Sequence, residues 1–209
     1  MGNKSVIVEA KRTPIGSFQG QLSMFSSPEL AAKVIESIFT TVNLGDFKPD
    51  EIILGNVLTS GLGQAPARQA AIYGGCGKSI EALTINKMCG SGLKAVMLAD
   101  QAIRSENANI ILAGGMESMS NSPYLLNKAR LGFKLGHGKI IDSVIHDGLW
   151  DAYNDKHMGN CAEMLASERN YSRVDQDAYA TLSYEKALKS QTNNSFDSEI
   201  IPIIYIDKK

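Results

Sequence analysis

The chain has 209 residues, of which 44% are hydrophobic, and its formal net charge at pH 7 is -1. These values are typical of a soluble globular protein that is large enough for one core, or for one core plus a smaller lobe. The balance of 21 basic and 22 acidic residues argues against binding to nucleic acid or to an anionic membrane, and no apolar run is long enough to span a bilayer.

Strand-like and helix-like segments alternate as far as residue 120. Apolar stretches predict strands over residues 5–10, 51–57, 82–87 and 109–113. Helical periodicity and terminal residues predict helices over residues 27–42, 66–73 and 92–104. This alternation predicts an α/β fold, in which right-handed crossover helices cover a parallel sheet.

The first helix has a recognisable start. Ser27 can cap it, Pro28 suits the first helical position, and the Glu29 carboxylate favours the positive end of the helix dipole. Apolar residues then recur at about every fourth position, which predicts one buried face. That face consists of Leu30, Val34, Ile38 and Val42.

The composition changes after Gly114 and Gly115, because residues 118–138 mix Ser, Asn, Pro, Gly and basic residues with little periodicity. Further on, the pattern predicts helices over residues 160–170 and from the capping box Ser172–Asp175 to about residue 190, and a strand over residues 199–206. We therefore expect a sheet-based domain over residues 1–118 and a mostly helical lobe over residues 119–209.

The helix expected over residues 92–104 is apolar on nearly every side, with Lys94, Asp100 and Gln101 as polar exceptions up to Ile103. Such a helix is normally buried on more than one side. The neighbouring strands can cover only one side, so we expect the other side to need a partner surface.

The three cysteines, Cys76, Cys89 and Cys161, are widely spaced and odd in number. Neither a CxxC pair nor a Cys/His cluster offers a zinc site, so no metal is expected. Free thiols indicate a reducing compartment, and the cytoplasm is the expected location.

Cys89 lies in the segment with the clearest chemical meaning, residues 86–93 (NKMCGSGL), where an expected strand hands over to an expected helix. Unpaired amides and the positive dipole end of a helix stabilise a thiolate at such a position, and Gly90 and Gly92 leave room for a substrate. The alternative is a buried core cysteine, which is common. A phosphate-binding loop is excluded, because the segment matches neither glycine-rich phosphate motif.

Residues 85–95 (INKMCGSGLKA) closely resemble the nucleophile segment of the thiolase family. The resemblance covers essentially the whole chain in order, with further matching segments at residues 12–18, 55–57, 63–70, 113–120, 147–149, 157–159, 162–163 and 200–202. It implies a thiolase-like α/β fold, with a parallel or mixed sheet domain that carries the nucleophile and a loop domain that binds coenzyme A.

The resemblance also implies a reaction, in which acyl groups pass between coenzyme A thioesters by covalent catalysis. Cys89 matches the nucleophile, and its backbone N–H would be one donor of the oxyanion hole. The expected substrates are acetyl-CoA, acetoacetyl-CoA and CoA, without a cofactor. Cys161 stands where the family usually has Thr and is not expected to be a second nucleophile.

Three residues match family positions at the coenzyme. Leu149 matches a residue near the bound coenzyme, and His157 with Met158 matches a pair beside the acyl group and the pantetheine arm. From the residues alone, His157 would be read as a polar residue opening a helix. The His157–Gly159 triplet is similar to that of the acetoacetyl-CoA-specific subgroup.

Thiolases are about twice as long as this chain and form dimers or tetramers, so we expect a homo-oligomer in which residues 124–139 project as a loop between dimers. The family's second half supplies a catalytic histidine and a second cysteine. No histidine follows His157 and no cysteine follows Cys161, so we expect the chain to end within a truncated loop domain and to lack the C-terminal domain.

Two functional hypotheses follow from this expectation. The chain is either half of an acetyl-CoA acetyltransferase that a second polypeptide completes, or an inactive truncated fragment. A related 3-oxoacyl-carrier-protein synthase has the same fold, but residues 86–95 and 157–159 argue against it.

Overall fold

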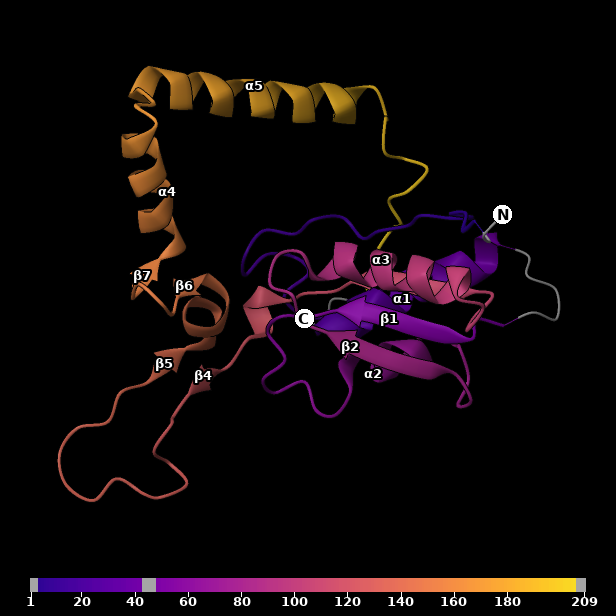
Figure 1. Ribbon diagram of the computed structural model, residues 1–209, viewed down its shortest axis with the longest axis horizontal. Coiled ribbons are helices and arrows are strands. Elements are labelled where there is room, and N and C mark those ends of the chain that lie inside the picture. The colour runs from indigo at the N-terminus through magenta and orange to yellow at the C-terminus, as the bar shows by residue number, and fades with distance from the viewer. Residues whose placement is uncertain (1–3, 43–47, 206–209) are drawn as a thin grey trace. The chain divides into compact units, whose positions relative to one another are not determined.

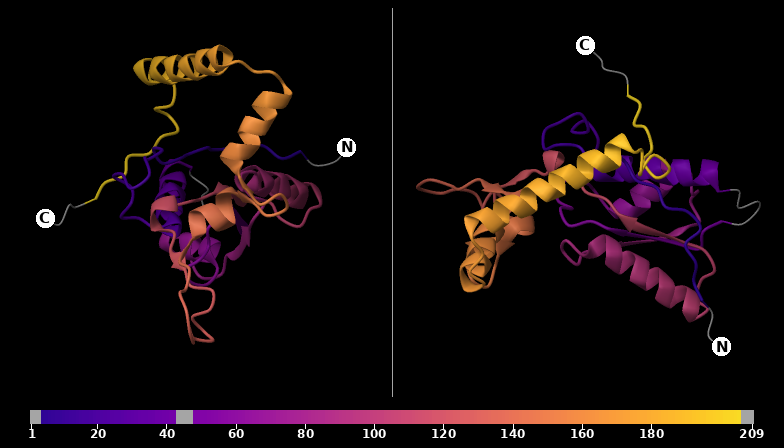
Figure 2. Two further views of the ribbon diagram at one scale, coloured as in Figure 1. Left: turned by 90° about the vertical axis from the view of Figure 1, so that its left-hand side faces the viewer. Right: turned by 90° about the horizontal axis from the view of Figure 1, so that it is seen from above.

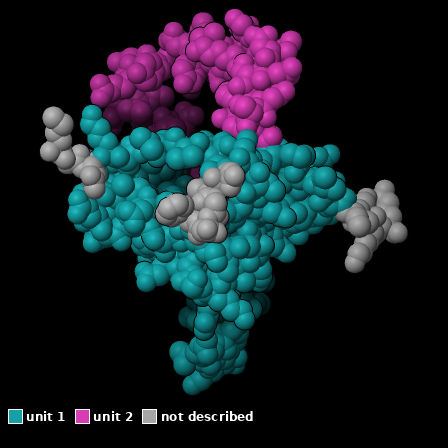
Figure 3. All heavy atoms as spheres, turned by 90° about the vertical axis from the view of Figure 1, so that its right-hand side faces the viewer, with its two compact units in different colours: residues 1–148, 201–209 teal, residues 149–200 magenta. Residues whose placement is uncertain are grey.

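The computed structural model describes residues 4–42 and 48–205. The chain separates into two compact units, Met1–Gly148 with Ile201–Lys209, and Leu149–Ile200 (Figure 3). Each unit is described by itself below. These units are defined by packing and are not the functional domains predicted above, whose boundary near residue 118 stays a prediction.

The first unit is built on a parallel sheet of three strands (Figure 1). The central strand β1 (Glu51–Gly55) lies between β2 (Glu81–Ile85) and β3 (Ile111–Gly115). Ile53 is paired with Leu83 on one side and with Ala113 on the other. The predicted α/β fold with a parallel sheet is therefore confirmed, with strand ends that differ from the predicted ones by a few residues.

Helices cover both faces of this sheet (Figure 2). Ile52 and Leu54 of β1 point to one face, where they share a core with α1 (Ser27–Thr41) and α2 (Pro66–Tyr73). The opposite face of β1 and β3 carries α3 (Ser91–Arg104). Alternate residues of a strand point to opposite faces, so β1 supplies both layers.

Helix α1 begins and packs differently from the prediction. Its cap is Ser26, whose N–H and Oγ both bond the Glu29 carboxylate at 2.7 Å, so Ser27 is already the first helical residue. The buried face is Ala31, Ala32 and Ile35 rather than the predicted Leu30, Val34, Ile38 and Val42. The predicted face was wrong because the small alanines let α1 approach the alanines of α2 closely.

The predicted strand over residues 5–10 is also wrong, because the structure pairs none of these residues in a ladder. Val6, Ile7 and Val8 are 78%, 80% and 72% exposed. A β-branched pattern favours extended backbone, but a strand also needs a partner to bond its amides. The strand expected over residues 199–206 is likewise absent from residues 201–205, and Ile206 lies outside the described residues.

The structure confirms the prediction for helix α3, because only part of its apolar surface is covered in this chain. Ser91, Ala95 and Ala99 are buried on the sheet side. Leu93 is 70% exposed, and Val96 and Met97 are also exposed. An open row of large apolar side chains marks a surface suited to an interface.

The first unit includes a long excursion between two short antiparallel strands, β4 (Tyr124–Leu125) and β5 (Ile141–Asp142) (Figure 1). Residues 126–140 are all exposed, as expected of a projecting loop. A short 3-10 turn, η1 (Met119–Asn121), precedes it.

The second unit consists of a hairpin and two helices. The hairpin pairs β6 (Trp150–Asp151) with β7 (Lys156–His157) and follows a helical turn, η2 (Val144–Leu149). The helices are α4 (Met158–Glu168) and α5 (Arg173–Thr192). Among residues 4–42 and 48–205, no helix combines the length and apolar composition that a membrane crossing requires.

The start of α5 confirms a predicted capping box. The Oγ of Ser172 accepts a hydrogen bond from the N–H of Asp175 at 3.1 Å, and the Asp175 carboxylate accepts from the N–H of Ser172 at 3.0 Å. These two bonds satisfy amides that the helix itself leaves unpaired. The Asp175 carboxylate also accepts from Oγ of Ser172 at 2.6 Å, and this bond, followed by that from the Ser172 N–H, holds the pKa of the carboxyl below its ordinary value.

Candidate active site

Cys89 lies where β2 hands over to α3, as predicted, and its side chain is exposed. Residues 86–90 form a short turn between the end of the strand and the first residue of the helix. Helix α3 begins two residues after the cysteine, and the N–H groups of Gly90 and Ser91 donate to the carbonyls of Lys87 and Met88 at 3.1 and 3.0 Å. Cys89 therefore lies beside the positive end of the helix dipole.

The turn is strained immediately before the cysteine. Met88 has φ +49°, a left-handed conformation that costs a side chain other than glycine about 1–3 kcal/mol. The Oγ of Ser91 accepts from the N–H of Lys87 at 2.8 Å and donates to the carbonyl of Met88 at 2.6 Å. The N–H of Met88 donates to Oδ1 of Asn86 at 2.9 Å. Side-chain hydrogen bonds therefore hold the conformation that presents Cys89.

A glycine beneath the turn lets helix α3 approach the sheet. A Cβ on Gly55, the last residue of β1, would lie 2.5 Å from Cβ of Ser91 and 2.7 Å from the backbone nitrogen of Gly92. A Cβ on Gly90 would lie 3.5 Å from the carbonyl oxygen of Lys87, which is ordinary contact. The close approach thus depends on Gly55, which the sequence singles out only as part of a matching segment.

Glu117 forms a second feature of the same sheet edge, which the sequence analysis missed. Its carboxylate accepts hydrogen bonds from Nδ2 of Asn56 at 2.7 Å, from the N–H of Val57 at 2.9 Å and from the N–H of Leu58 at 3.2 Å. Burial nevertheless raises the pKa of this carboxyl above its ordinary value, because it outweighs these bonds. The signal in the sequence was a single acid two residues after an apolar strand, within the matching segment 113–120.

The three predicted coenzyme residues lie together in the second unit. Trp150 pairs with His157 in the hairpin, Leu149 directly precedes β6, and Met158 is the first residue of α4. His157 is also the cap of α4, and its Nδ1 accepts from the N–H of Gly159 at 3.0 Å. The structure therefore gives His157 the capping role that the residues alone suggested. Cys89 belongs to the first unit, so its convergence with these residues stays a prediction.

The turn of this hairpin is held by Asp151. Its carboxylate accepts from Nδ2 of Asn154 at 2.6 Å and from the N–H of Tyr153 at 3.0 Å. These bonds, the Asn154 side chain first, hold the pKa of Asp151 below its ordinary value. The turn joins β6 to β7, whose pairing places Trp150 opposite His157.

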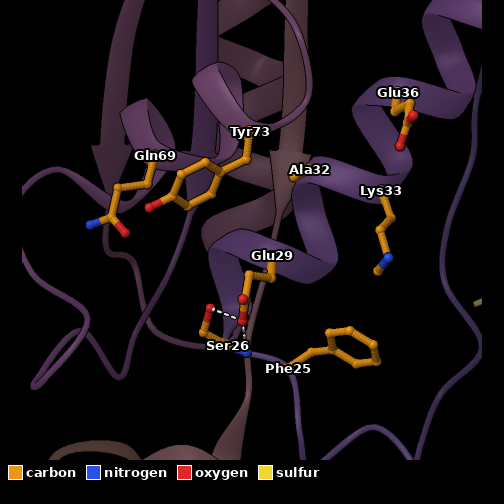
Figure 4. Close-up of a pocket in the computed structure, with 8 residues that line it drawn as sticks. All are labelled: Phe25, Ser26, Glu29, Ala32, Lys33, Glu36, Gln69 and Tyr73. Atoms are coloured by element: carbon orange, nitrogen blue, oxygen red, sulfur yellow. Dashed lines mark hydrogen bonds between the residues drawn. The ribbon is translucent and has the colours of Figure 1, made fainter. Parts of the chain in front are cut away.

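A separate groove lies between α1 and α2 (Figure 4). Lys33 lies over the ring of Phe25, with Nζ 5.1 Å from the ring centroid. The residues that line this groove do not include Cys89, and they do not include Leu149, His157 or Met158. The described part of the chain contains no group of three or more His, Cys, Asp or Glu residues placed to hold a metal ion.

The three cysteines differ in environment, and their reactivity should follow. Burial raises the pKa of the Cys76 thiol from its ordinary 9.0 to about 11, whereas Cys89 is exposed and Cys161 is half-buried. At pH 8 we expect iodoacetamide to modify Cys89 and Cys161 and to leave Cys76 unmodified until the chain unfolds, as read by peptide mass spectrometry. Rapid modification of Cys76 in the folded protein would contradict its burial.

The raised pKa of Cys76 also determines how the free energy of unfolding changes with pH. As the pH rises above about 9, the unfolded chain loses this proton before the folded chain does. The unfolded state is thereby favoured, so the free energy of unfolding should fall as the pH rises from about 9 towards 11. Denaturant midpoints measured across this range, with Cys76→Ala as the control, isolate the contribution.

The fold and the turn define a class of protein, the α/β proteins that present a cysteine at the carboxyl edge of a parallel sheet. The model of one family, described as "Thiolase, N-terminal domain", matches residues 5–209. The chain belongs to the thiolase family.

Individual relatives agree with this assignment. The chain is 51% identical over 198 residues to "Acetyl-CoA acetyltransferase" of Pseudomonas aeruginosa, which covers 95% of this chain and 50% of that protein. It is 49% identical over 199 residues to "Probable acetyl-CoA acetyltransferase" of Escherichia coli, covering 95% of this chain and 51% of that protein. "Probable acetyl-CoA acyltransferase" of Staphylococcus aureus (strain COL) is 47% identical over 204 residues, 98% of this chain and 52% of that protein. The chain thus spans about half the length of these curated relatives.

Proposed function

We propose that this chain is the nucleophile-bearing part of an acetyl-CoA acetyltransferase and that it transfers acyl groups through a thioester on Cys89. The observation that supports this most directly is the exposed thiol of Cys89 on a strained turn at the start of α3. The likeness to "Acetyl-CoA acetyltransferase" of Pseudomonas aeruginosa supports the substrate class, coenzyme A thioesters.

The proposed thiolysis proceeds in two steps. Sγ of Cys89 attacks the 3-oxo carbon of acetoacetyl-CoA, and the bond from this carbon to its neighbour breaks. The electron pair leaves on that neighbouring carbon, which takes up a proton to give acetyl-CoA. The thiolate of CoA then attacks the acetyl group on Cys89, releases the cysteine thiolate and gives a second acetyl-CoA. Splitting the transfer in this way lowers each barrier, and condensation is the reverse.

The other predicted residues take supporting roles in this proposal. The backbone N–H of Cys89 donates to the oxygen that becomes negative as the sulfur attacks. Leu149, His157 and Met158 contact the coenzyme and the acyl group, and all three belong to the second unit, at or next to its hairpin. The reaction needs no cofactor besides its thioester substrates. In the assembled enzyme, the loop over residues 124–139 contacts another copy in a dimer or tetramer.

The test is the intact mass of the chain after mixing with acetoacetyl-CoA. We expect the wild type and Cys161→Ala to gain one acetyl group and Cys89→Ala to gain none, because only Cys89 offers the nucleophile. The adduct should be lost completely in Cys89→Ala. The control is that this variant unfolds at the same denaturant concentration as the wild type, which shows that it is still folded. An equal adduct on Cys89→Ala would refute the assignment.

A second candidate function rests on the open face of α3, where Leu93, Val96 and Met97 are exposed. Under this alternative the chain acts only after another polypeptide covers that face and supplies the group that activates Cys89, or it is an inactive fragment. Absence of an acetyl adduct on the wild type, together with normal folding, would favour this alternative over independent activity.

A further inference from the structure

We propose that Glu117 is a positioning residue for Cys89, which holds the end of β1 so that β1 in turn holds the nucleophile turn. The inference rests on the proposed function in one respect, that Cys89 is the reacting group. Glu117 itself does not touch the thiol in this scheme. It acts through hydrogen bonds that cross the carboxyl edge of the sheet from β3 to β1 to β2.

The first step joins β3 to β1. Glu117 lies two residues beyond β3, and its carboxylate bonds Asn56, Val57 and Leu58 at 2.7–3.2 Å. Nδ2 of Asn56 also donates to the carbonyl of Met116 at 3.3 Å. One side chain thus fixes the backbone that leaves β1.

The second step joins β1 to the turn. The carbonyl of Val57, whose own N–H is bonded to Glu117, accepts from Nδ2 of Asn86 at 3.5 Å. Oδ1 of the same Asn86 accepts from the N–H of Met88 at 2.9 Å. Asn86 therefore links the segment that Glu117 holds to the strained residue before Cys89.

The turn depends on such bonds because packing does not hold it. Met88 and Cys89 are both exposed, and Met88 has a positive φ that relaxes once its support is lost. Ser91 ties the turn from the helix side. Glu117 and Asn86 tie it from the sheet side.

Glu117 is held by hydrogen bonds rather than by an ion pair. The residue is exposed, partial burial of its carboxyl raises the pKa, and no ion pair joins it to a cation within residues 4–42 and 48–205. The three hydrogen bonds that the carboxylate accepts therefore fix its position beside the residues that leave β1.

The chain offers a matched control at the other end of the same two strands. Oδ2 of Asp50, directly before β1, accepts from the N–H groups of Asn109 and Ile110, directly before β3, at 2.7 and 3.1 Å. Asp50→Asn and Glu117→Gln thus remove equivalent carboxylates that bridge β1 and β3. Only Glu117 lies at the end that carries Cys89.

The experiment compares the rate at which iodoacetamide modifies Cys89 in the wild type, Glu117→Gln and Asp50→Asn. Peptide mass spectrometry separates Cys89 from Cys161, which serves as the reference within the same molecule. We expect Glu117→Gln to slow modification of Cys89 at pH 7 by roughly three- to tenfold, the equivalent of about one hydrogen bond.

Modification of Cys161 should not change in either variant, and Asp50→Asn should leave the Cys89 rate unchanged even if both variants unfold more easily. An unchanged Cys89 rate in folded Glu117→Gln, or an equal decrease in Asp50→Asn, overturns the proposal. If Glu117→Gln does not fold, Asn86→Ala breaks the second step at an exposed residue and should give the same decrease. An unchanged rate in Asn86→Ala then overturns it.

Iodoacetamide needs only the thiol, so this result is independent of acyl transfer. Failure of the wild type to form an acetyl adduct from acetoacetyl-CoA would count against the proposed function alone. A slower Cys89 modification in Glu117→Gln would still support the positioning role.

Discussion

Gly55→Ala is expected to destabilise the first unit by about 1–3 kcal/mol, the usual cost of adding a methyl group to a filled space, and to abolish most acetylation of Cys89. The added Cβ would lie 2.5 Å from Cβ of Ser91 and 2.6 Å from its backbone carbon. Backbone atoms cannot rotate away as a flexible side chain can, so α3 must move off the sheet. The turn that carries Cys89 would move with it.

Gly114→Ala is the matched control, because it makes the same change on the neighbouring strand β3. Its Cβ would come no closer than 3.9 Å, to Cδ2 of Leu54, which is ordinary contact. Urea denaturation and intact mass after incubation with acetoacetyl-CoA should show a loss for Gly55→Ala and near wild-type behaviour for Gly114→Ala. Equal behaviour of the two variants would show that α3 is not held against β1 as described.

Ile52→Ala should cause the second large effect, a loss of about 2–5 kcal/mol in the free energy of unfolding. Ile52 is the second residue of the central strand β1 and is completely buried in the core that the sheet shares with α1 and α2. Removing its side chain leaves a cavity that the surrounding backbone cannot fill. The expected observation is a lower denaturant midpoint with an unchanged slope.

Ile7→Ala provides the comparison, since it removes the same atoms from a side chain that is 80% exposed. Its effect should stay within about 0.5 kcal/mol, as for most surface substitutions. A large loss in Ile7→Ala would mean that the segment around residue 7 is covered in solution, for instance by another chain. The pair of variants therefore tests both the core and the exposure of the N-terminal segment.

The elements of the sheet domain were predictable because their signals are local. Each of β1, β2 and β3 is a short apolar run, and Pro66 and Pro28 stand near the starts of α2 and α1. Alternation of such elements leaves few arrangements other than a parallel sheet. The position of Cys89 at a strand-to-helix turn followed from the same reasoning.

Features that depend on distant partners could not be predicted in this way. The face of α1 that is buried was decided by the alanines of α2, not by the hydrophobicity of Leu30 and Val34. Residues 5–10 have the composition of a strand but no ladder partner. Propensity describes what a segment tolerates, and tertiary contacts decide what it does.

The supporting residues of the candidate site show the same limit. Gly55 and Glu117 act on a turn that is more than 25 residues away in sequence from each of them. Gly55 acts by allowing the close spacing between β1 and α3, and Glu117 acts through hydrogen bonds across the sheet edge. The sequence around Cys89 does not predict either role.

The excursion between β4 and β5 has a consequence for how such a chain can diverge. Residues 126–140 are exposed throughout, and each doubling of a flexible loop costs only about 0.6 kcal/mol in closure entropy. Insertions, deletions and charge changes there leave the sheet and the nucleophile turn untouched. The sequence at the tip of the excursion can therefore vary between descendants while the turn that carries Cys89 stays the same.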